Sequence, residues 1–206
     1  MSFQELTSGI LLKQYRISIF KEVFRKTIHL CSALIPFFLA SYYWQMIVLL
    51  ILALAGYSAS EIVRLKGINV PLISKITAIA ARKRDENKFV LGPVTLVIGI
   101  LIAAILWESE AARIGIYALA FGDGLASLVG KLIGRVHIPG TKGKTAAGSL
   151  TCFFAVFVSS FAVGNNAFVS LILGITAMVI EVIPMTDFDN IVIPVAVGGL
   201  SQFLLF

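Results

Sequence analysis

Residues 90–107 read VLGPVTLVIGILIAAILW and contain no charged side chain. A helix that crosses a bilayer needs about 20 mostly apolar residues, within a range of about 17–25, so this stretch is long enough to span a membrane. Six further stretches are mostly apolar and of comparable length, at residues 28–44, 45–60, 112–132, 148–164, 167–183 and 190–206. The sequence therefore predicts an all-α integral membrane protein with about seven transmembrane helices, which form one polytopic domain over residues 1–206.

The composition excludes the common classes of soluble protein. Apolar residues make up 58% of the 206 residues, charged residues only 14%, and the mean hydropathy is +0.95. An average soluble domain is roughly 25% charged, because water must solvate its surface. A soluble enzyme and a disordered tail are therefore excluded. A secreted disulfide scaffold is excluded as well, because the only cysteines are Cys31 and Cys152, which we interpret as reduced.

The basic residues are distributed unevenly along the chain. The net charge of +6 would suggest nucleic-acid binding in a soluble protein. In a membrane protein, however, lysines and arginines collect in cytoplasmic loops. Every Lys and Arg except Arg113 falls in the N-terminal segment, in residues 61–88 or in residues 131–147. This pattern predicts a cytoplasmic N-terminus, and we expect no nucleic-acid partner.

The N-terminal segment has its own pattern. Between Leu12 and Arg25, apolar residues such as Ile19 and Val23 alternate with basic ones, which favours a helix that lies at the membrane interface. The expected location is the cell (cytoplasmic) membrane if the source is prokaryotic, and an endomembrane if it is eukaryotic.

The most informative motif is Phe121-Gly-Asp-Gly-Leu-Ala-Ser-Leu-Val-Gly-Lys-Leu-Ile-Gly-Arg135. Its Asp123 lies within an apolar span, where an aspartate costs about 2.5–3.5 kcal/mol on insertion scales, so a functional role is expected. Ala126, Gly130 and Gly134 are four residues apart and share one face of a helix. A face of small residues admits either a nucleotide or the backbone of another helix, and spacing alone leaves both open.

A second motif follows in the loop Pro139-Gly-Thr-Lys-Gly-Lys-Thr-Ala-Ala-Gly-Ser149. Backbone N–H groups near glycines, together with Lys142 and Lys144, suit a phosphate group. The run Gly143-Lys144-Thr145 invites comparison with a P-loop. A P-loop would need a glycine at position 138, where this chain has Ile138, and it occurs within a soluble βαβ unit. Neither requirement is met, so we reject this interpretation.

Three smaller groups lie near the same predicted face. Arg25, Lys26 and His29 lie where the first span enters the membrane. They could either set the orientation of the chain in the membrane or bind a ligand. Glu61 lies three residues before Arg64, so the two share a helix face and are able to pair. The two acids of Thr186-Asp-Phe-Asp-Asn190 suit Mg²⁺, because this ion is commonly held by one or two carboxylates together with substrate phosphates. The alternative is a solvated loop in which one aspartate caps the N-terminus of a helix.

At these residues the chain resembles a known family. Asp123-x-x-Ala126-x-x-x-Gly130-x-x-x-Gly134, followed by Gly143-Lys144-Thr145-x-x-Gly148, is similar to the CTP-binding signature of the dolichol, polyprenol and phytol kinases. Their relatives include a CTP-dependent diacylglycerol kinase. The Arg25-Lys26-x-x-His29, Glu61-x-x-Arg64 and Glu181…Asp187-x-Asp189-Asn190 groups also resemble that family.

The resemblance implies transfer of the γ-phosphate of CTP to the hydroxyl of a membrane lipid alcohol, with Mg²⁺, at the cytoplasmic face. The lipid would be of the polyprenol, dolichol or phytol type, or a diacylglycerol. The implied metal ligands are Asp123 with Asp187 or Asp189, and the implied base is His29 or Glu61. Lys144, with Lys142, would hold the phosphates. The remaining residues implied at the nucleotide are Arg25, Lys26, Gly122, Gly130, Gly134, Thr145, Gly148 and Ser149.

Two other functions compete with this one. A CTP:phosphatidate cytidylyltransferase carries a similar CTP motif, but its C-terminal signature is rich in His, Gly and Asp-Arg, whereas this chain reads MTDFDN at residues 185–190. A transporter or membrane assembly subunit could use Asp123 and Glu181 as an ion path. It should spread polar residues through the membrane depth, whereas here the acids cluster near the inner face.

Overall fold

The computed structural model describes residues 3–68, 76, 77, 79, 81, 85, 88–141 and 143–205, with side chains from residue 12 onward. All regular secondary structure in these residues is helical, apart from one antiparallel bridge between His137 and Thr145. This finding confirms the predicted all-α class. The described helices are α1 (Phe3–Cys31), η1 (Ser32–Leu34), α2 (Ile35–Ser41), α3 (Tyr43–Leu65), α5 (Gly92–Leu106), α6 (Ser109–Tyr117), η3 (Ala118–Asp123), α7 (Gly124–Ile133), α8 (Ala146–Val163), α9 (Ala167–Val182) and α10 (Asp189–Leu205).

Four helical segments are long and apolar enough to cross a membrane. They are Leu12–Ser41, Tyr43–Leu65, Ser109–Ile133 and Ala146–Val163. The other three predicted spans correspond to α5, α9 and α10, which are apolar helices of 15, 16 and 17 residues. At 1.5 Å per residue, each of these three is shorter than a hydrocarbon core of about 30 Å. The seven predicted spans are therefore all helical, and four of them have full spanning length.

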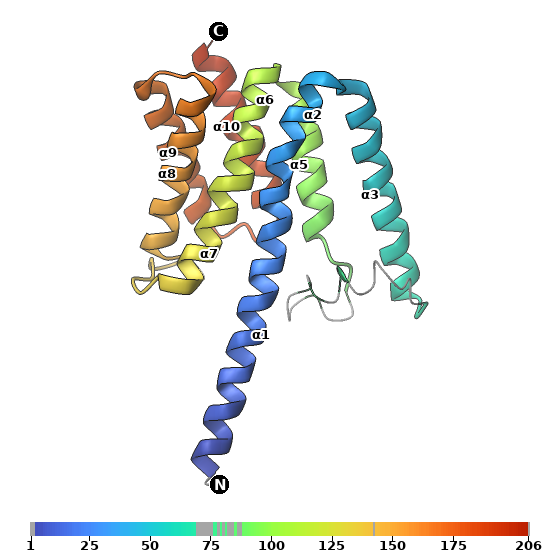
Figure 1. Cartoon of the computed structure of the whole chain (residues 1–206), viewed down its shortest axis with the longest axis vertical. Coiled ribbons are helices and arrows are strands. Elements are labelled where there is room, and N and C mark those ends of the chain that lie inside the picture. Colours follow the sequence, from blue (N-terminus) through green and yellow to red (C-terminus); the bar gives the residue numbers. More distant parts are fainter. Residues whose placement is uncertain are drawn as a thin grey trace.

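The first helix differs from the sequence prediction. We expected a separate interfacial helix over Leu12–Arg25, but in the structure this stretch is the middle of α1 and runs without a break into the first span. The physical reason is that no glycine or proline occurs between Leu12 and Cys31 to interrupt the helix. Figure 1 shows the N-terminal part of α1 projecting away from the other helices.

The connections between helices divide between the two ends of the bundle, in the way that the charge pattern predicts. The N-terminal side of α1, the end of α3, the α7–α8 loop and the α9–α10 loop lie toward one end in Figure 1. The α2–α3, α5–α6 and α8–α9 connections and the C-terminus lie toward the other end. The described parts of the basic segments therefore lie toward one end, and the assignment of that end to the cytoplasm stays a prediction.

Close contacts at glycines hold α10 against its neighbours. A Cβ atom at Gly99 of α5 would lie 2.0 Å from the carbonyl oxygen of Asn190, and one at Gly115 of α6 would lie 2.3 Å from that of Pro194. The Asn190 side chain also donates to Thr95 Oγ1 at 2.9 Å. Small residues and interhelical hydrogen bonds are the usual means by which helices associate in membranes. These contacts place the start of α10 against α5.

The Gly99 contact yields a stability prediction. Gly99→Ala should lower the free energy of unfolding by about 1–3 kcal/mol, because the added methyl group displaces the α10 backbone. The matched control is Gly56→Ala in α3, where a Cβ would contact nothing within 4 Å; this change should be neutral or stabilising by up to about 1 kcal/mol. Thermal unfolding of both variants in detergent measures the difference. Equal unfolding temperatures would contradict the packing assigned to Gly99.

Candidate functional site

Asp123 stands at a break in helix geometry. The segment from Ser109 to Ile133 is one long helix interrupted by the π-helical turn η3, and Asp123 is the last residue of that turn. Such turns are frequent at functional sites, because they redirect side chains from the regular helical positions. The Asp123 side chain is almost fully buried, at 2% exposure. A buried carboxylate in an apolar span requires nearby partners.

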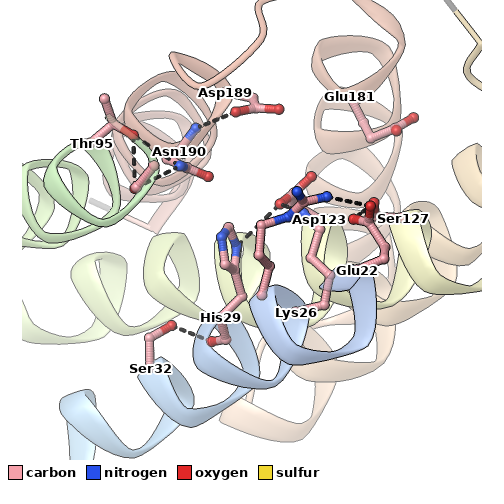
Figure 2. Close-up of polar contacts among 12 residues, drawn as sticks. Glu22, Lys26, His29, Ser32, Thr95, Asp123, Ser127, Glu181, Asp189 and Asn190 are labelled. Atoms are coloured by element: carbon pink, nitrogen blue, oxygen red, sulfur yellow. Dashed lines mark hydrogen bonds and ion pairs between the residues drawn. The ribbon is translucent and has the colours of Figure 1, made fainter. Parts of the chain in front are cut away.

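The partners of Asp123 come from α1. Lys26 donates from Nζ to Asp123 Oδ2 at 2.5 Å, and His29 Nδ1 lies 3.2 Å from the same oxygen. Because Lys26 and His29 are three residues apart, they lie on the same face of α1, as Figure 2 shows. Both are buried. The structure thus brings together two groups of residues that the sequence singled out separately.

Glu22 extends this cluster by one turn of α1. It pairs with Arg25 and lies 3.6 Å from Lys131 Nζ. It also accepts a hydrogen bond from Ser127 Oγ at 2.8 Å, as Figure 2 shows. The sequence analysis did not single out Glu22. Its spacing of four residues from Lys26 and three from Arg25, on an otherwise basic segment, is the signal that would have identified it.

Lys144 and Glu181 form a second ion pair. Lys144 Nζ donates to Glu181 Oε1 at 2.6 Å, and Ser149 Oγ donates to Glu181 Oε2 at 2.9 Å. Burial lowers the pKa of the Lys144 ammonium, but the Glu181 carboxylate outweighs burial and raises that pKa above its ordinary value. Lys144 is therefore positively charged at neutral pH. Ser149, which the sequence assigned to the nucleotide, instead holds Glu181 in place.

The loop that carries Lys144 is a short hairpin. Ile138 N donates to the Lys144 carbonyl at 2.9 Å, and Gly140 and Gly143 have φ angles of 77° and 98°, which glycine adopts without strain. The hairpin leads directly into α8, where the Thr145 side chain caps the helix by accepting from Gly148 N. Lys142, which we predicted to act with Lys144, lies outside the described residues.

A cavity of about 700 Å³ lies between these ion pairs. This volume is within the usual range for small-molecule sites, roughly 300–1,000 Å³. Polar and charged side chains from α1, α7, the α7–α8 hairpin, α9 and α10 line the cavity together with glycines. Nine residues that the sequence analysis assigned to the site border it, namely Arg25, Lys26, Asp123, Gly130, Gly134, Lys144, Thr145, Gly148 and Asp189.

The glycine face of α7 packs against the start of α8 and also borders the larger cavity. A Cβ at Gly130 would lie 2.8 Å from Thr145 Oγ1, and one at Gly134 would lie 2.4 Å from the same atom. A Cβ at Gly148 would lie 2.8 Å from the Ala126 carbonyl oxygen. The packing interpretation of this face is therefore correct for α7 against the start of α8. Gly130, Gly134 and Gly148 also border the cavity, so close packing and access to a ligand coexist.

A smaller cavity of about 50 Å³ adjoins the first one. Arg25, Lys26 and Asp189 border both cavities, whereas His29 and Asp187 border only the smaller one. The rest of its lining is largely apolar and comes from Ile28, Val90, Pro93 and Leu96, together with Gly92, Asp85 and Asn190.

Two predicted residues lie elsewhere. Glu61 is fully buried and borders neither cavity; Arg64 donates to both of its oxygens, and the Val90 N–H donates to Oε1 at 2.9 Å. The structure therefore brings Glu61 to the chain before α5 and not to Asp123. Gly122 is buried against α8, where a Cβ would lie 2.9 Å from Val156 Cγ2.

The predicted metal ligands lie in two places. Among the described residues, no three His, Cys, Asp or Glu side chains converge in a way that could hold a metal ion. Asp123 and Asp189 nevertheless border the same cavity, and both α1 contacts of Asp123 involve Oδ2. Two carboxylates at one cavity that has room for substrate phosphates fit the way Mg²⁺ is usually bound. Asp187 faces the smaller cavity instead.

Comparison with known proteins identifies relatives along the whole chain. No family profile and no solved structure matches it. The chain is 30% identical to the chloroplastic farnesol kinase of Arabidopsis thaliana over 142 residues, which are 61% of this chain and 46% of that protein. It is 28% identical to phytol kinase 1 of Arabidopsis thaliana over all of this chain and 71% of that protein. It is 29% identical to a probable phytol kinase 2 of Glycine max over 99% of this chain and 70% of that protein.

These relatives are longer than the chain, which covers less than half of the farnesol kinase. All three are described as kinases of prenol-type alcohols, and two of the alignments extend over essentially the entire chain. The resemblance inferred from Asp123, the glycine face and Lys144 is thereby confirmed. The chain is therefore similar along essentially its whole length to proteins described as phytol kinases, and along part of its length to a farnesol kinase.

Proposed function

We propose that this chain is a lipid kinase that transfers the γ-phosphate of CTP to the hydroxyl group of a prenol-type membrane alcohol. One observation carries the proposal: the larger cavity combines four cationic side chains, two aspartates and the first turn of α8 at one end of the bundle. The cations are Arg25, Lys26, Lys131 and Lys144. The names of the relatives, farnesol kinase and phytol kinase, supply the class of acceptor.

The cations suit the phosphate groups of a nucleotide. Phosphoryl transfer requires alignment of the reactants and neutralisation of charge, with little covalent chemistry from the protein. Lys144 stands at the start of α8, where the backbone N–H groups and the helix dipole also favour an anion. Glu181 and Asp123 hold Lys144 and Lys26 in position, so both ammonium groups are oriented before a ligand arrives.

Asp123 and Asp189 are the residues that would hold Mg²⁺. Both border the larger cavity, and the contacts of Asp123 with Lys26 and His29 are both made through Oδ2. When bound, the ion supplies positive charge at the phosphates. Asp187 borders only the smaller cavity, so we assign the metal to Asp189 in preference to Asp187.

His29 is the better candidate for the base. It borders the smaller cavity, and its Nδ1 faces Asp123, which orients the ring as a carboxylate orients a catalytic histidine. The other nitrogen, Nε2, is then the one that accepts the proton of the alcohol. Glu61 is less suitable, because Arg64 and the Val90 N–H engage its oxygens and Glu61 itself borders neither cavity.

The donor and the reaction are tested together by labelled CTP. Purified protein with Mg²⁺ and farnesol or phytol should transfer label from the γ-phosphorus of CTP, and none from the α-phosphorus, into the lipid product. Label from the α-phosphorus would replace the kinase with a cytidylyltransferase. An equal or faster reaction with ATP would contradict the choice of CTP, which rests on the resemblance of the motif.

Removal of the Asp123 charge should abolish turnover. We expect Asp123→Asn to lower kcat by at least about 100-fold, because even groups that only support a metal ligand contribute 10–100-fold. Asp189→Asn, at a partly exposed side chain, should also lower kcat and raise the Mg²⁺ concentration for half-maximal rate. The control is Glu110→Gln, an exposed acid of α6 at the opposite end. Wild-type rates in folded Asp123→Asn protein would remove Asp123 from the mechanism.

Loss of Lys144 should weaken nucleotide binding. A hydrogen bond to a charged group contributes about 1.5–3 kcal/mol, so Lys144→Ala should raise the Kd for CTP by roughly 10-fold or more. Lys66→Ala, at an exposed lysine after α3, is the control for general loss of charge.

The variant leaves Glu181 without its ion-pair partner, so Lys144→Ala with Glu181→Gln should be titrated in parallel. An unchanged CTP titration in the double variant, with unfolding temperature preserved, would contradict the assignment of Lys144 to the phosphates.

A further inference from the structure

We propose that Glu22 is a positioning residue of the larger cavity, and that its carboxylate holds the Arg25 guanidinium in the orientation in which it meets a phosphate group of the nucleotide. This inference rests on the proposed kinase function and deepens it, because it adds a residue that controls how the phosphates are bound. It acts through Arg25 and does not itself touch the nucleotide.

A carboxylate beside a phosphate site needs an explanation, because the two negative charges repel each other. Among the described residues, four acids border the larger cavity, namely Glu22, Asp123, Glu181 and Asp189. The proposed metal site uses both aspartates, and Glu181 pairs with Lys144. Glu22 is buried and has neither of these roles, so the repulsion that it causes must be offset by what it holds in place.

Both oxygens of the Glu22 carboxylate are engaged. Oε1 accepts a hydrogen bond from Ser127 Oγ at 2.8 Å, as Figure 2 shows, and Arg25 Nη2 donates to Oε2. Ser127 belongs to α7 and Arg25 to the next turn of α1, so two helices fix the carboxylate. An ion pair at this spacing on an exposed helix surface contributes little. Here the acid is buried and is oriented from outside its own helix, so it is able to orient its partner.

The other cations of the larger cavity are held by other groups. Lys131 Nζ lies 3.6 Å from Glu22 Oε2, which is beyond hydrogen-bond distance, and it donates to the Ser18 carbonyl at 2.8 Å. The Ser18 contact therefore holds Lys131 even without the Glu22 charge. Lys26 and Lys144 pair with acids other than Glu22.

Arg25 is therefore the cavity cation that Glu22 positions. A guanidinium presents its N–H groups in a rigid planar fork that matches a phosphate, so its orientation decides how many hydrogen bonds it forms with that phosphate. The long side chain of Arg25 would also lose rotamer entropy when a ligand immobilises it. Because Glu22 engages one edge of the fork in advance, part of that cost is met before the nucleotide binds.

A purely structural role for Glu22 is the competing explanation, because its contact with Ser127 also joins α1 to α7. The two roles make different predictions. A structural link would lower the unfolding temperature, and it would act whether or not Arg25 is present. A positioning role changes nucleotide binding, and it acts only when Arg25 is present.

Glu22→Gln tests the role through the sign of its effect on nucleotide binding. The amide keeps the size of the side chain and still accepts from Ser127, but it loses the charge that holds Arg25. We expect the Kd for CTP to rise at least about 3-fold, as part of the roughly 10-fold or more that a hydrogen bond to a charged group contributes. If Glu22 only repelled the phosphates, the same change would lower that Kd. The matched control is Glu110→Gln, at an exposed acid of α6, which should leave the Kd unchanged.

The dependence on Arg25 is tested by a double-mutant cycle. In the Arg25→Met background no guanidinium remains to be positioned. Adding Glu22→Gln there should leave the Kd for CTP unchanged or lower it, because only the repulsion is removed. CTP titration of the purified proteins in detergent with Mg²⁺ measures the cycle without requiring turnover. An equal rise of the Kd in both backgrounds would identify Glu22 as a structural link and overturn the inference.

If Glu22→Gln does not fold, Ser127→Ala takes its place in the cycle. This change keeps every charge and removes only the hydrogen bond that orients Glu22 Oε1. It should raise the Kd for CTP at least about 2-fold when Arg25 is present, and less than that in the Arg25→Met background. An unchanged Kd in folded Ser127→Ala protein would then overturn the inference.

The proposed function and the role of Glu22 fail in different ways. Wild-type protein that neither binds CTP nor transfers its γ-phosphate would overturn the proposed function. If wild-type protein binds and transfers, and the Kd of Glu22→Gln protein is equal to or below that of wild type, the function stands and only the positioning role is overturned.

Discussion

The structure depends on how one buried carboxylate is neutralised. Asp123 lies in an apolar helix, and its charge is tolerated because Lys26 and His29 reach it from α1. This contact fixes α1 against the π-helical turn that ends at Asp123, so the ion pair positions a helix as well as a charge. Removing one partner of a buried pair typically costs more than the pair contributes, which makes this contact a constraint on the whole site.

The small residues of α7 and α8 also serve two purposes, helix packing and access to the larger cavity. Gly130, Gly134 and Gly148 allow α7 to approach the start of α8, and all three also border the larger cavity. Close packing brings the N-terminus of α8, with Lys144 beside it, to the same cavity as Asp123. A side chain at any of these positions would separate the two helices and fill part of the space proposed for the nucleotide. Helix packing and ligand access are therefore one requirement on the sequence.

A good part of the fold and site was accessible from the sequence. Uncharged runs such as residues 90–107 predicted the helices, and the distribution of lysine and arginine predicted which loops share an end. The motif around Asp123 and Lys144 indicated the kinase family, which the relatives confirm. The separate interfacial helix was wrong, because an amphipathic pattern continues smoothly into a span when no helix breaker intervenes.

What the sequence by itself determined was the membrane class, the helical segments and the identity of the charged groups, because these follow from local hydropathy and spacing. Only the tertiary structure decided which of those groups meet. It placed Lys26 and His29 on Asp123, added Glu22, paired Lys144 with Glu181, and directed Glu61 to Val90. The physical reason is that ion pairs between helices depend on helix rotation and interhelical contact, which short-range sequence patterns do not encode.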